Sequence, residues 1–282
     1  MRRPDDMASW EVPEGMESPL DFALAERDRD TMEMVRSALD RQDVVLAFQP
    51  VVQAARPGAV AFYEGLIRIL DDTGRVIPAG DFIETAETSQ IGRKIDCLAL
   101  EMGLIALSEN PSLRLSINMS ARSIGSPHWM QVLKDGLRAD PTAGDRLILE
   151  ITESSAMMLP DLVGAFMHDQ QCSGIAFALD DFGAGHTSFR YLREFYFDLV
   201  KIDSQFIRGI AQCADNQVLT TALQSISRHF DMFTVAVGVE SAEDAAFLQQ
   251  IGIDCMQGYY YGAATIQPPW KTPARKGVLH AG

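Results

Sequence analysis

The sequence predicts a closed α/β barrel of eight strands, a TIM-like (β/α)8 fold. From residue 113 to residue 261, short apolar runs alternate with longer segments of helical spacing, which is typical of strands joined by helices. Polar residues such as Asp180 and Asp181 stand at the ends of several apolar runs. Because strand ends converge on one face of such a barrel, the two observations together favour one closed barrel over separate domains.

The expected elements follow the chain in order. Residues 1–20 are polar and contain Pro4, Pro13 and Pro19, which predicts a loose tail. Apolar, β-branched runs predict the strands, at residues 44–52, 60–70, 113–117, 146–151, 175–179, 199–203, 233–239 and 255–261. Helical spacing predicts the helices, at residues 21–41, 82–109 with a break near Gly92, 127–137, 159–170, 188–194, 217–230 and 242–251. The basic, Gly- and Pro-rich stretch after Pro268 is expected to be a second tail.

Composition excludes several classes of function. The formal net charge of −15 disfavours binding to nucleic-acid polymers and to anionic membranes. No apolar run is long enough to insert into a membrane, and the N-terminus lacks the apolar core of a secretory signal. The four cysteines are widely scattered, which argues against disulfides and a zinc site. We therefore expect a cytoplasmic protein.

The most informative stretch is the strand at 175–179, which runs into Asp180 and Asp181 and then into a Gly-x-Gly loop. Adjacent carboxylates at the end of a buried strand are costly unless a cation lies between them. Carboxylate oxygens suit hard divalent cations such as Mg²⁺ or Mn²⁺. An ordinary turn, in which Asp and Gly end a strand, explains these few residues equally well.

Other strands carry groups that could bind a metal or a phosphate. Each has an ordinary explanation: an Asn that forms a turn, a solvated Glu, or a Lys at an exposed edge. Their occurrence on successive strands is what indicates a single site. The groups are Glu64, Arg68, Asn118, Glu150, Asp180, Asp181, Lys201 and Gln257.

These residues belong to a series of motifs in fixed order. The motifs are Phe48-Gln49-Pro50-Val51, Glu64-Gly65-Leu66-Ile67-Arg68, Ile117-Asn118-Met119-Ser120, Leu149-Glu150-Ile151-Thr152-Glu153-Ser154, Leu179-Asp180-Asp181-Phe182-Gly183-Ala184-Gly185, Lys201-Ile202-Asp203, Gly238-Val239-Glu240 and Gln257-Gly258-Tyr259. With them the chain resembles the EAL-domain family, the bacterial cyclic di-GMP phosphodiesterases. The resemblance implies an EAL-type barrel over residues 30–267, with an N-terminal tail and helix start at 1–29 and a C-terminal tail at 268–282.

The resemblance also implies roles for individual residues. A first Mg²⁺ or Mn²⁺ is expected at Glu64, Asn118, Glu150 and Asp180, and a second at Asp180 and Asp181 with one further Glu. Two such cations polarise phosphoryl oxygens and activate water. Lys201 and Asp181 are the implied catalytic groups together with Glu153, which is expected to hold the loop at 182–188. The implied substrate contacts come from Gln49, Arg68, Asp203 and Gln257. The implied partners are cyclic di-GMP, a second copy of the chain in a homodimer, and a partner protein.

One position departs from the family pattern. Where the family has Ala-Glu-Gly-Val-Glu, this chain reads Ala236-Val237-Gly238-Val239-Glu240. The missing Glu is a ligand of the second metal and the proposed general base. Valine offers no oxygen, so a weak second metal site and impaired hydrolysis are expected; losing a general base alone costs about 10²–10⁴-fold in rate.

Three functions therefore stay open. The first is a module that binds cyclic di-GMP through groups such as Arg68 and Gln49 and reports it to a partner, with hydrolysis weak or lost. The second is a working phosphodiesterase that opens the ring to linear pGpG, rescued by a neighbouring acid. The third is an interaction domain that binds no nucleotide. Retention of Asp181 and Lys201 favours the second, whereas Val237 favours the first.

Overall fold

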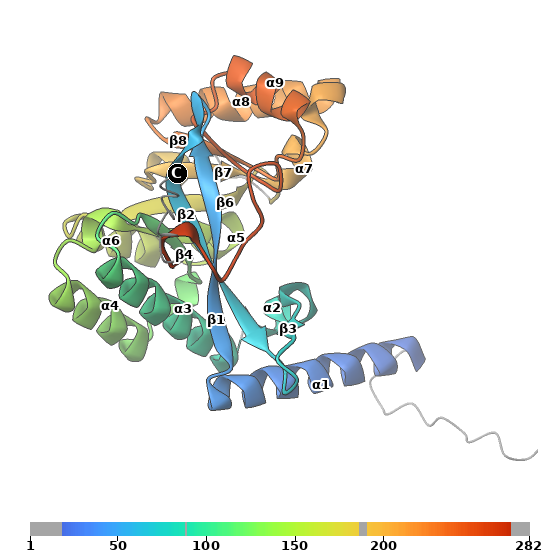
Figure 1. Ribbon diagram of the computed structural model, residues 1–282, viewed down its shortest axis with the longest axis vertical. Coiled ribbons are helices and arrows are strands. Elements are labelled where there is room, and N and C mark those ends of the chain that lie inside the picture. The colour runs from blue at the N-terminus through green and yellow to red at the C-terminus, as the bar shows by residue number, and fades with distance from the viewer. Residues whose placement is uncertain (1–18, 88, 186–190, 272–282) are drawn as a thin grey trace, which may run out of the picture. The chain divides into compact units, whose positions relative to one another are not determined.

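The computed structural model describes residues 19–87, 89–185 and 191–271 (Figure 1). The chain divides into two compact units. One unit comprises Met1–Val44 and Arg68–Gly92, and the other comprises Val45–Ile67 and Arg93–Gly282. Within the described ranges, no helix combines the length and the apolar character that crossing a membrane requires.

The smaller unit is built on the helix α1 (Pro19–Arg41). Val35, Ala38 and Leu39 lie on one face of this helix and are fully or almost fully buried, as spacing of three and four residues predicts. The unit also contains β3 (Val76–Ile77), which pairs antiparallel with the end of β2 (Arg56–Leu70), and the short helix α2 (Ile83–Glu87).

The larger unit contains the barrel, and the predicted eight-stranded α/β barrel is confirmed. Its order around the barrel is β1-β9-β8-β7-β6-β5-β4-β2, and pairing of β1 with β2 closes it. Its strands besides β2 are β1 (Val44–Gln53), β4 (Leu115–Asn118), β5 (Leu147–Thr152), β6 (Ala176–Phe182), β7 (Leu199–Ile202), β8 (Phe233–Val237) and β9 (Cys255–Gln257).

One strand of the barrel runs against the others. β2 and β4 to β9 pair in parallel, whereas β1 pairs antiparallel with β9. Only Ala54 and Ala55 separate β1 from β2, and a parallel crossover needs a connection of a dozen or more residues. The short connection therefore makes a hairpin of the first two strands.

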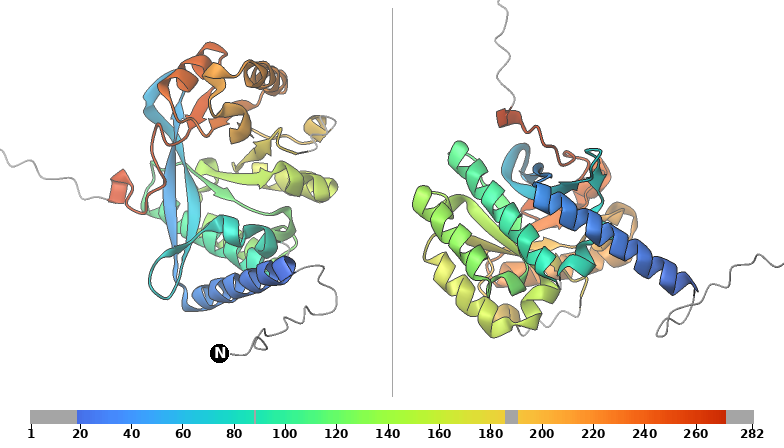
Figure 2. Two further views of the ribbon diagram at one scale, coloured as in Figure 1. Left: turned by 90° about the vertical axis from the view of Figure 1, so that its right-hand side faces the viewer. Right: turned by 90° about the horizontal axis from the view of Figure 1, so that it is seen from below.

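Helices follow most of the remaining strands. Their bounds are α3 (Gln90–Glu109), α4 (Pro127–Ala139), α5 (Glu153–Met158), α6 (Pro160–Gln171), α7 (Ser204–Ile207), α8 (Ala214–His229) and α9 (Ala242–Gln250). Figure 2 shows α3, α4 and α6 side by side on the outside of the strands. Side-chain caps fix where several helices begin. At the start of α9, Ser241 Oγ accepts a hydrogen bond from the backbone N–H of Asp244.

Two predicted strands proved too long, each for a local reason. The strand expected at 233–239 ends at Val237, because Gly238 has a φ of 86° that glycine adopts readily. The strand expected at 255–261 ends at Gln257. There the chain turns back at Gly258, where an added Cβ would lie 2.0 Å from Val239 O. The second turn comes directly after Gln257, a residue of the predicted site.

The helical predictions differ in smaller ways. The helix expected at 82–109 breaks before Gln90 rather than near Gly92. Gly92 instead permits close packing, since an added Cβ would lie 2.5 Å from Ala86 O. The helix expected from Gln217 begins three residues earlier, at Ala214. Of the helix expected at 188–194, Tyr191–Arg193 forms a 3₁₀ turn and the first residues lie outside the described ranges, as do most of both predicted tails.

The interior of the barrel contains an apolar cluster below the site residues. Val51, Phe62, Ile148, Ala178, Leu199 and Val235 form this inner cluster, and Val237 packs against it. A larger apolar core fills the space between the strands and the surrounding helices. The inner cluster therefore separates the two ends of the barrel.

Candidate functional site

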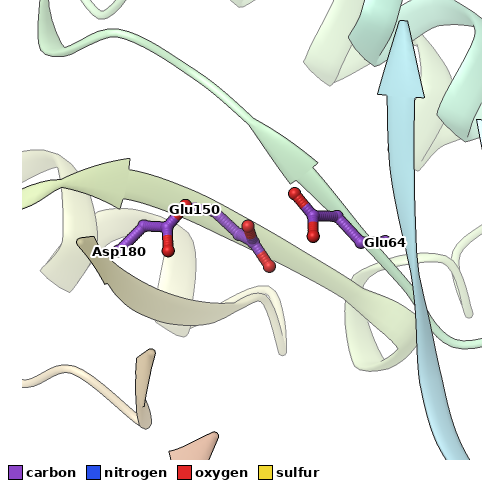
Figure 3. A group of neighbouring side chains, drawn as sticks. All are labelled: Glu64, Glu150 and Asp180. Carbon is purple, nitrogen blue, oxygen red and sulfur yellow. The ribbon is translucent and has the colours of Figure 1, made fainter. Parts of the chain in front are cut away.

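Three acidic side chains from three strands of the barrel converge on one place. Glu64 on β2, Glu150 on β5 and Asp180 on β6 each contribute a carboxylate oxygen, and these oxygens lie within 4.8 Å of one another (Figure 3). Glu64 and Glu150 are buried and Asp180 is partly buried. The structure therefore brings together three of the predicted metal ligands.

The strand register explains this convergence. Asn118 on β4 stands opposite Glu150, and Thr152 at the end of β5 stands opposite Asp180. The register between β6 and β7 then shifts between Leu179 and Phe182, and Asp181 lies in the left-handed region with a φ of 55°. Asp and Asn tolerate this conformation better than other non-glycine residues, which gives a physical reason for an aspartate at this bulge.

Lys201 on β7 supplies the positive charge of the cluster. Its Nζ lies 2.6 Å from Glu150 Oε2, 3.1 Å from Glu64 Oε2 and 3.4 Å from Asp180 Oδ2. The Lys201 side chain is only 2% exposed. A buried ammonium without anionic partners would be very costly, so the lysine and the acids depend on one another.

Amide side chains from three strands orient Glu64 and each other. Asn118 Nδ2 donates to Glu64 Oε1 at 2.8 Å, and Gln257 Nε2 donates to Glu64 Oε2 at 2.6 Å. Gln257 also donates to Gln49 Oε1 at 3.2 Å, and Gln49 donates to Gly262 O at 3.1 Å. Gln257 is almost fully buried, so its observed role is to hold Glu64.

Burial and mutual repulsion shift the titration of these groups. Burial, together with the charge of Glu64, raises the pKa of Glu150 to about 8. Burial also raises the pKa of Asp180. Burial would raise the pKa of Glu64 too, but the ammonium of Lys201 and the amide donors outweigh it and lower that pKa. The pKa of Lys201 stays well above its ordinary value, because three carboxylates outweigh its burial.

These residues fit one divalent cation. Three carboxylates share a single ammonium, and Glu150 Oε1 is buried with no hydrogen-bond partner among the described residues. An unpartnered carboxylate oxygen beside two further acids matches the oxygen ligands that Mg²⁺ and Mn²⁺ prefer. Glu64, Glu150 and Asp180 would hold such an ion, with the Asn118 amide oxygen as a further ligand.

Val237 lies beside this cluster at the end of β8. It pairs with Gln257 and lines a cavity of about 170 Å³ with Gln257 and Gln49. Glu240 is the only carboxylate on the described lining of this cavity. Glu240 Oε1 lies 3.3 Å from Arg208 Nε in a half-exposed ion pair. On this lining Val237 therefore presents a hydrocarbon side chain, and Glu240 presents the carboxylate.

The remaining predicted residues occupy different places. Burial, with the nearby charges of Asp180 and Asp203, raises the pKa of Asp181 to about 6. Asp203 caps α7 by accepting a bond from Gln205 N. Glu153, buried at the start of α5, accepts a bond from Gly183 N at 3.1 Å. Arg68 lies on β2 four residues beyond Glu64, within the smaller unit.

A family model for the EAL domain matches residues 32–264. This chain belongs to the EAL domain family. The match covers the barrel strands and all the site residues described above. The resemblance to the EAL-domain family inferred from the ordered motifs is thereby confirmed.

Relatives of this EAL domain carry names from cyclic di-GMP signalling. The chain is 30% identical over 232 residues to the cyclic di-GMP phosphodiesterase PdeB of Shewanella oneidensis, covering 81% of this chain and 27% of that protein. It is 29% identical over 245 residues to the bifunctional diguanylate cyclase/cyclic di-GMP phosphodiesterase MucR of Pseudomonas aeruginosa, covering 85% of this chain and 36% of that protein. The chain thus spans about a third of these relatives.

Solved structures agree with the fold. A PaMucR phosphodiesterase in a c-di-GMP complex superposes with a TM-score of 0.74 at 27% identity, covering 84% of this chain and 97% of that one. The EAL domain of FimX from Pseudomonas aeruginosa, also bound to c-di-GMP, superposes with a TM-score of 0.76 at 24% identity, covering 84% and 97%. At that lower identity the likeness to FimX concerns the fold.

Sequence reasoning missed two features of the site. The first is the hydrogen bond from the Gln257 amide to Glu64, 193 residues away; the contact of Gln257 with a substrate stays a prediction. The pairing of Arg208 with Glu240 beside Val237 was not anticipated either. Neither has a local signal, because each pair joins residues that are far apart in the sequence.

Proposed function

We propose that this EAL domain binds cyclic di-GMP at the carboxyl end of its barrel and hydrolyses it weakly or not at all. The observation that carries the proposal is the cluster of Glu64, Glu150 and Asp180, which connects through Gln257 to Val237. The names of the relatives and the c-di-GMP complex of PaMucR support the choice of nucleotide.

The proposed roles follow from the arrangement. Glu64, Glu150 and Asp180 hold one Mg²⁺ or Mn²⁺, which when bound polarises a phosphoryl oxygen. Asn118 and Gln257 keep the Glu64 carboxylate oriented. Lys201 neutralises negative charge that develops on the phosphate. Arg68 binds a phosphate, for which its planar, permanently charged group is well suited.

Val237 limits the chemistry in this proposal. A carboxylate at this place would take the proton from an attacking water or share in binding a second cation. Valine can do neither, and it packs against the inner apolar cluster. A binding site with one cation and little turnover is the expected result.

The alternative is an active phosphodiesterase that produces linear pGpG. Two observations favour it: Asp181 and Lys201 are retained, and the Glu240 carboxylate lines the same cavity as Val237. Glu240 could replace the missing acid only after leaving Arg208, 3.3 Å away.

One experiment separates the two functions. The purified protein is incubated with cyclic di-GMP and Mg²⁺ or Mn²⁺, pGpG is followed by chromatography, and binding is measured by calorimetry. Binding with turnover at least about 10²-fold below that of an active EAL phosphodiesterase supports the proposal. Turnover equal to that enzyme supports the alternative. Absence of binding, or an unchanged affinity of Arg68→Ala, contradicts the assigned nucleotide site.

A further inference from the structure

Gln257 joins the carboxylate cluster to the cavity of about 170 Å³ that Val237 lines. Its Nε2 donates to Glu64 Oε2 at 2.6 Å, and the residue also forms part of the cavity lining. A nucleotide whose phosphate lies at the cluster would therefore have its nucleoside about one side chain away from this Val237 cavity. Arg208 and Tyr259 belong to the same lining and have no part in the roles proposed above.

The main chain at Arg208 is fixed on both sides. Arg208 follows α7 directly, and its N–H donates to Ser204 O at 3.0 Å. Beyond it, the buried carboxylate of Asp244 accepts from Gly209 N at 3.3 Å and from Ala211 N at 2.9 Å. The backbone that carries the guanidinium is thus in place before a ligand arrives, which lowers the entropic cost of binding.

Glu240 pairs with one nitrogen of the Arg208 guanidinium. The Nε of Arg208 lies 3.3 Å from Glu240 Oε1, and the two side chains are 61% and 48% exposed. An ion pair this exposed adds little stability, so its main effect is to orient the guanidinium. Among the residues that the structure describes, none accepts a hydrogen bond from the two terminal nitrogens. Both terminal nitrogens are therefore available to a ligand.

Cyclic di-GMP, the ligand proposed above, offers an arginine two kinds of acceptor. One is the oxygens of a phosphate, and the other is the O6 and N7 pair of guanine, which accepts two bonds from one arginine. Arg208 is the only cation and Glu240 the only anion on the described lining. A phosphate there would meet the carboxylate as well as the guanidinium, and like charges oppose binding. Guanine carries no charge, so the pair of side chains favours the base.

Tyr259 adds an aromatic surface to the same lining. It lies two residues after Gln257 and is 73% exposed. Aromatic side chains bind nucleic-acid bases by stacking on their faces, whichever base is present. An arginine instead recognises the edge of a base: adenine has an amino donor where guanine has O6, so only guanine offers both acceptors. Tyr259 and Arg208 therefore suit the face and the edge of one guanine.

We propose that one guanine of cyclic di-GMP binds at the Val237 cavity, where its O6 and N7 accept hydrogen bonds from the terminal nitrogens of Arg208 and its face stacks on Tyr259. Glu240 holds the guanidinium in the required orientation. This role of Arg208 rests on the proposed function, because it presupposes a cyclic dinucleotide at the carboxylate cluster. Arg208 then selects guanine over adenine, whether or not the nucleotide is hydrolysed.

The test compares cyclic di-GMP with an analogue in which 7-deazaguanine replaces both guanines. The analogue keeps both phosphates but has a C–H group in place of N7. Calorimetry with the full chain and Mg²⁺ should show the analogue binding about tenfold more weakly, since one hydrogen bond from a charged donor is lost. Arg208→Ala should bind cyclic di-GMP about tenfold more weakly and no longer distinguish the two ligands. Tyr259→Ala should weaken both ligands about tenfold and keep the preference.

The control is Arg138→Ala on α4. Arg138 also forms an exposed ion pair, with Asp135 at 2.8 Å, but it lies outside the cavity lining. This variant should bind both ligands as the unmodified chain does, and circular dichroism checks that every variant is folded. Equal affinity of the unmodified chain for the two ligands overturns the guanine contact, as does an Arg208→Ala protein that keeps the preference. If the unmodified chain binds neither ligand, the proposed function fails, and the guanine site fails with it.

Discussion

Lys201 Nζ lies 2.6 Å from Glu150 Oε2, and both side chains are almost completely removed from solvent. This pair places an ammonium inside the cluster of acids that would hold a metal. A divalent cation that binds there must share the carboxylates with Lys201. The lysine therefore stabilises the site in the absence of metal, and its removal should make the fold depend on a cation.

Lys201→Met tests this dependence. Without metal, the variant leaves buried acids with no counter-charge, and breaking such a cluster costs about 3–5 kcal/mol. We expect a lower midpoint of urea unfolding in EDTA. Mn²⁺ should then raise the midpoint of the variant more than that of the unmodified chain, because binding to the folded state stabilises it. Lys134→Met, at an exposed position of α4, is the matched control. An equal Mn²⁺ effect in all three proteins contradicts the prediction.

Val237→Glu tests whether the missing carboxylate limits hydrolysis. The new side chain can enter the cavity of about 170 Å³ that Val237 lines. We expect release of pGpG from cyclic di-GMP with Mn²⁺ to rise at least about 10²-fold. The measurement is product formed per chain at saturating nucleotide.

Two further variants make that result specific. In Val237→Gln the new side chain has nearly the size of glutamate but carries no charge, so turnover should stay low. Glu240→Gln should have no effect if Glu240 serves only Arg208. If the Val237→Glu protein binds cyclic di-GMP but does not turn it over faster, the missing carboxylate is not what limits hydrolysis. If Glu240→Gln loses the basal turnover of the unmodified chain, Glu240 serves as the acid in place of the one missing at position 237.

The strands and the acids at their ends were predictable because the signals are local. Apolar runs mark the strands, and the parallel arrangement brings Glu64, Glu150 and Asp180 to one end. That Val237 departs from the family pattern stays a prediction from the sequence. None of this required knowledge of the side-chain contacts.

The remaining features depend on contacts between distant residues. β8 and β9 end where Gly258 packs on the backbone of Val239. No residue pattern within either strand predicts this contact. The hydrogen bond from Gln257 to Glu64 joins β9 and β2, the two strands that flank β1. Such features follow from how the barrel closes rather than from local spacing.

Gly258→Ala probes the turn that ends β9. An added Cβ would lie 2.0 Å from Val239 O and 2.4 Å from Val239 N. Backbone atoms cannot give way as a flexible side chain can, so we expect a loss of stability on the order of 3 kcal/mol, measured by urea unfolding. Gly58→Ala is the control, since nothing lies within 4 Å of its added Cβ. A Gly258→Ala protein as stable as Gly58→Ala would contradict this account of the turn.

The cysteines should differ in their reaction with iodoacetamide. Burial, together with the acids beside each thiol, raises the pKa of both Cys97 and Cys255 to about 11. A raised pKa keeps a thiol protonated, so at pH 8 only about one in 10³ of these groups is the reactive thiolate. Cys172 is exposed and should be alkylated first. Mass spectrometry of peptides after timed alkylation measures each rate. The alkylation rates at Cys97 and Cys255 should rise about tenfold per pH unit between pH 8 and pH 10. If Cys255 were labelled as fast as Cys172 at pH 8, burial in β9 would not be raising the pKa of its thiol.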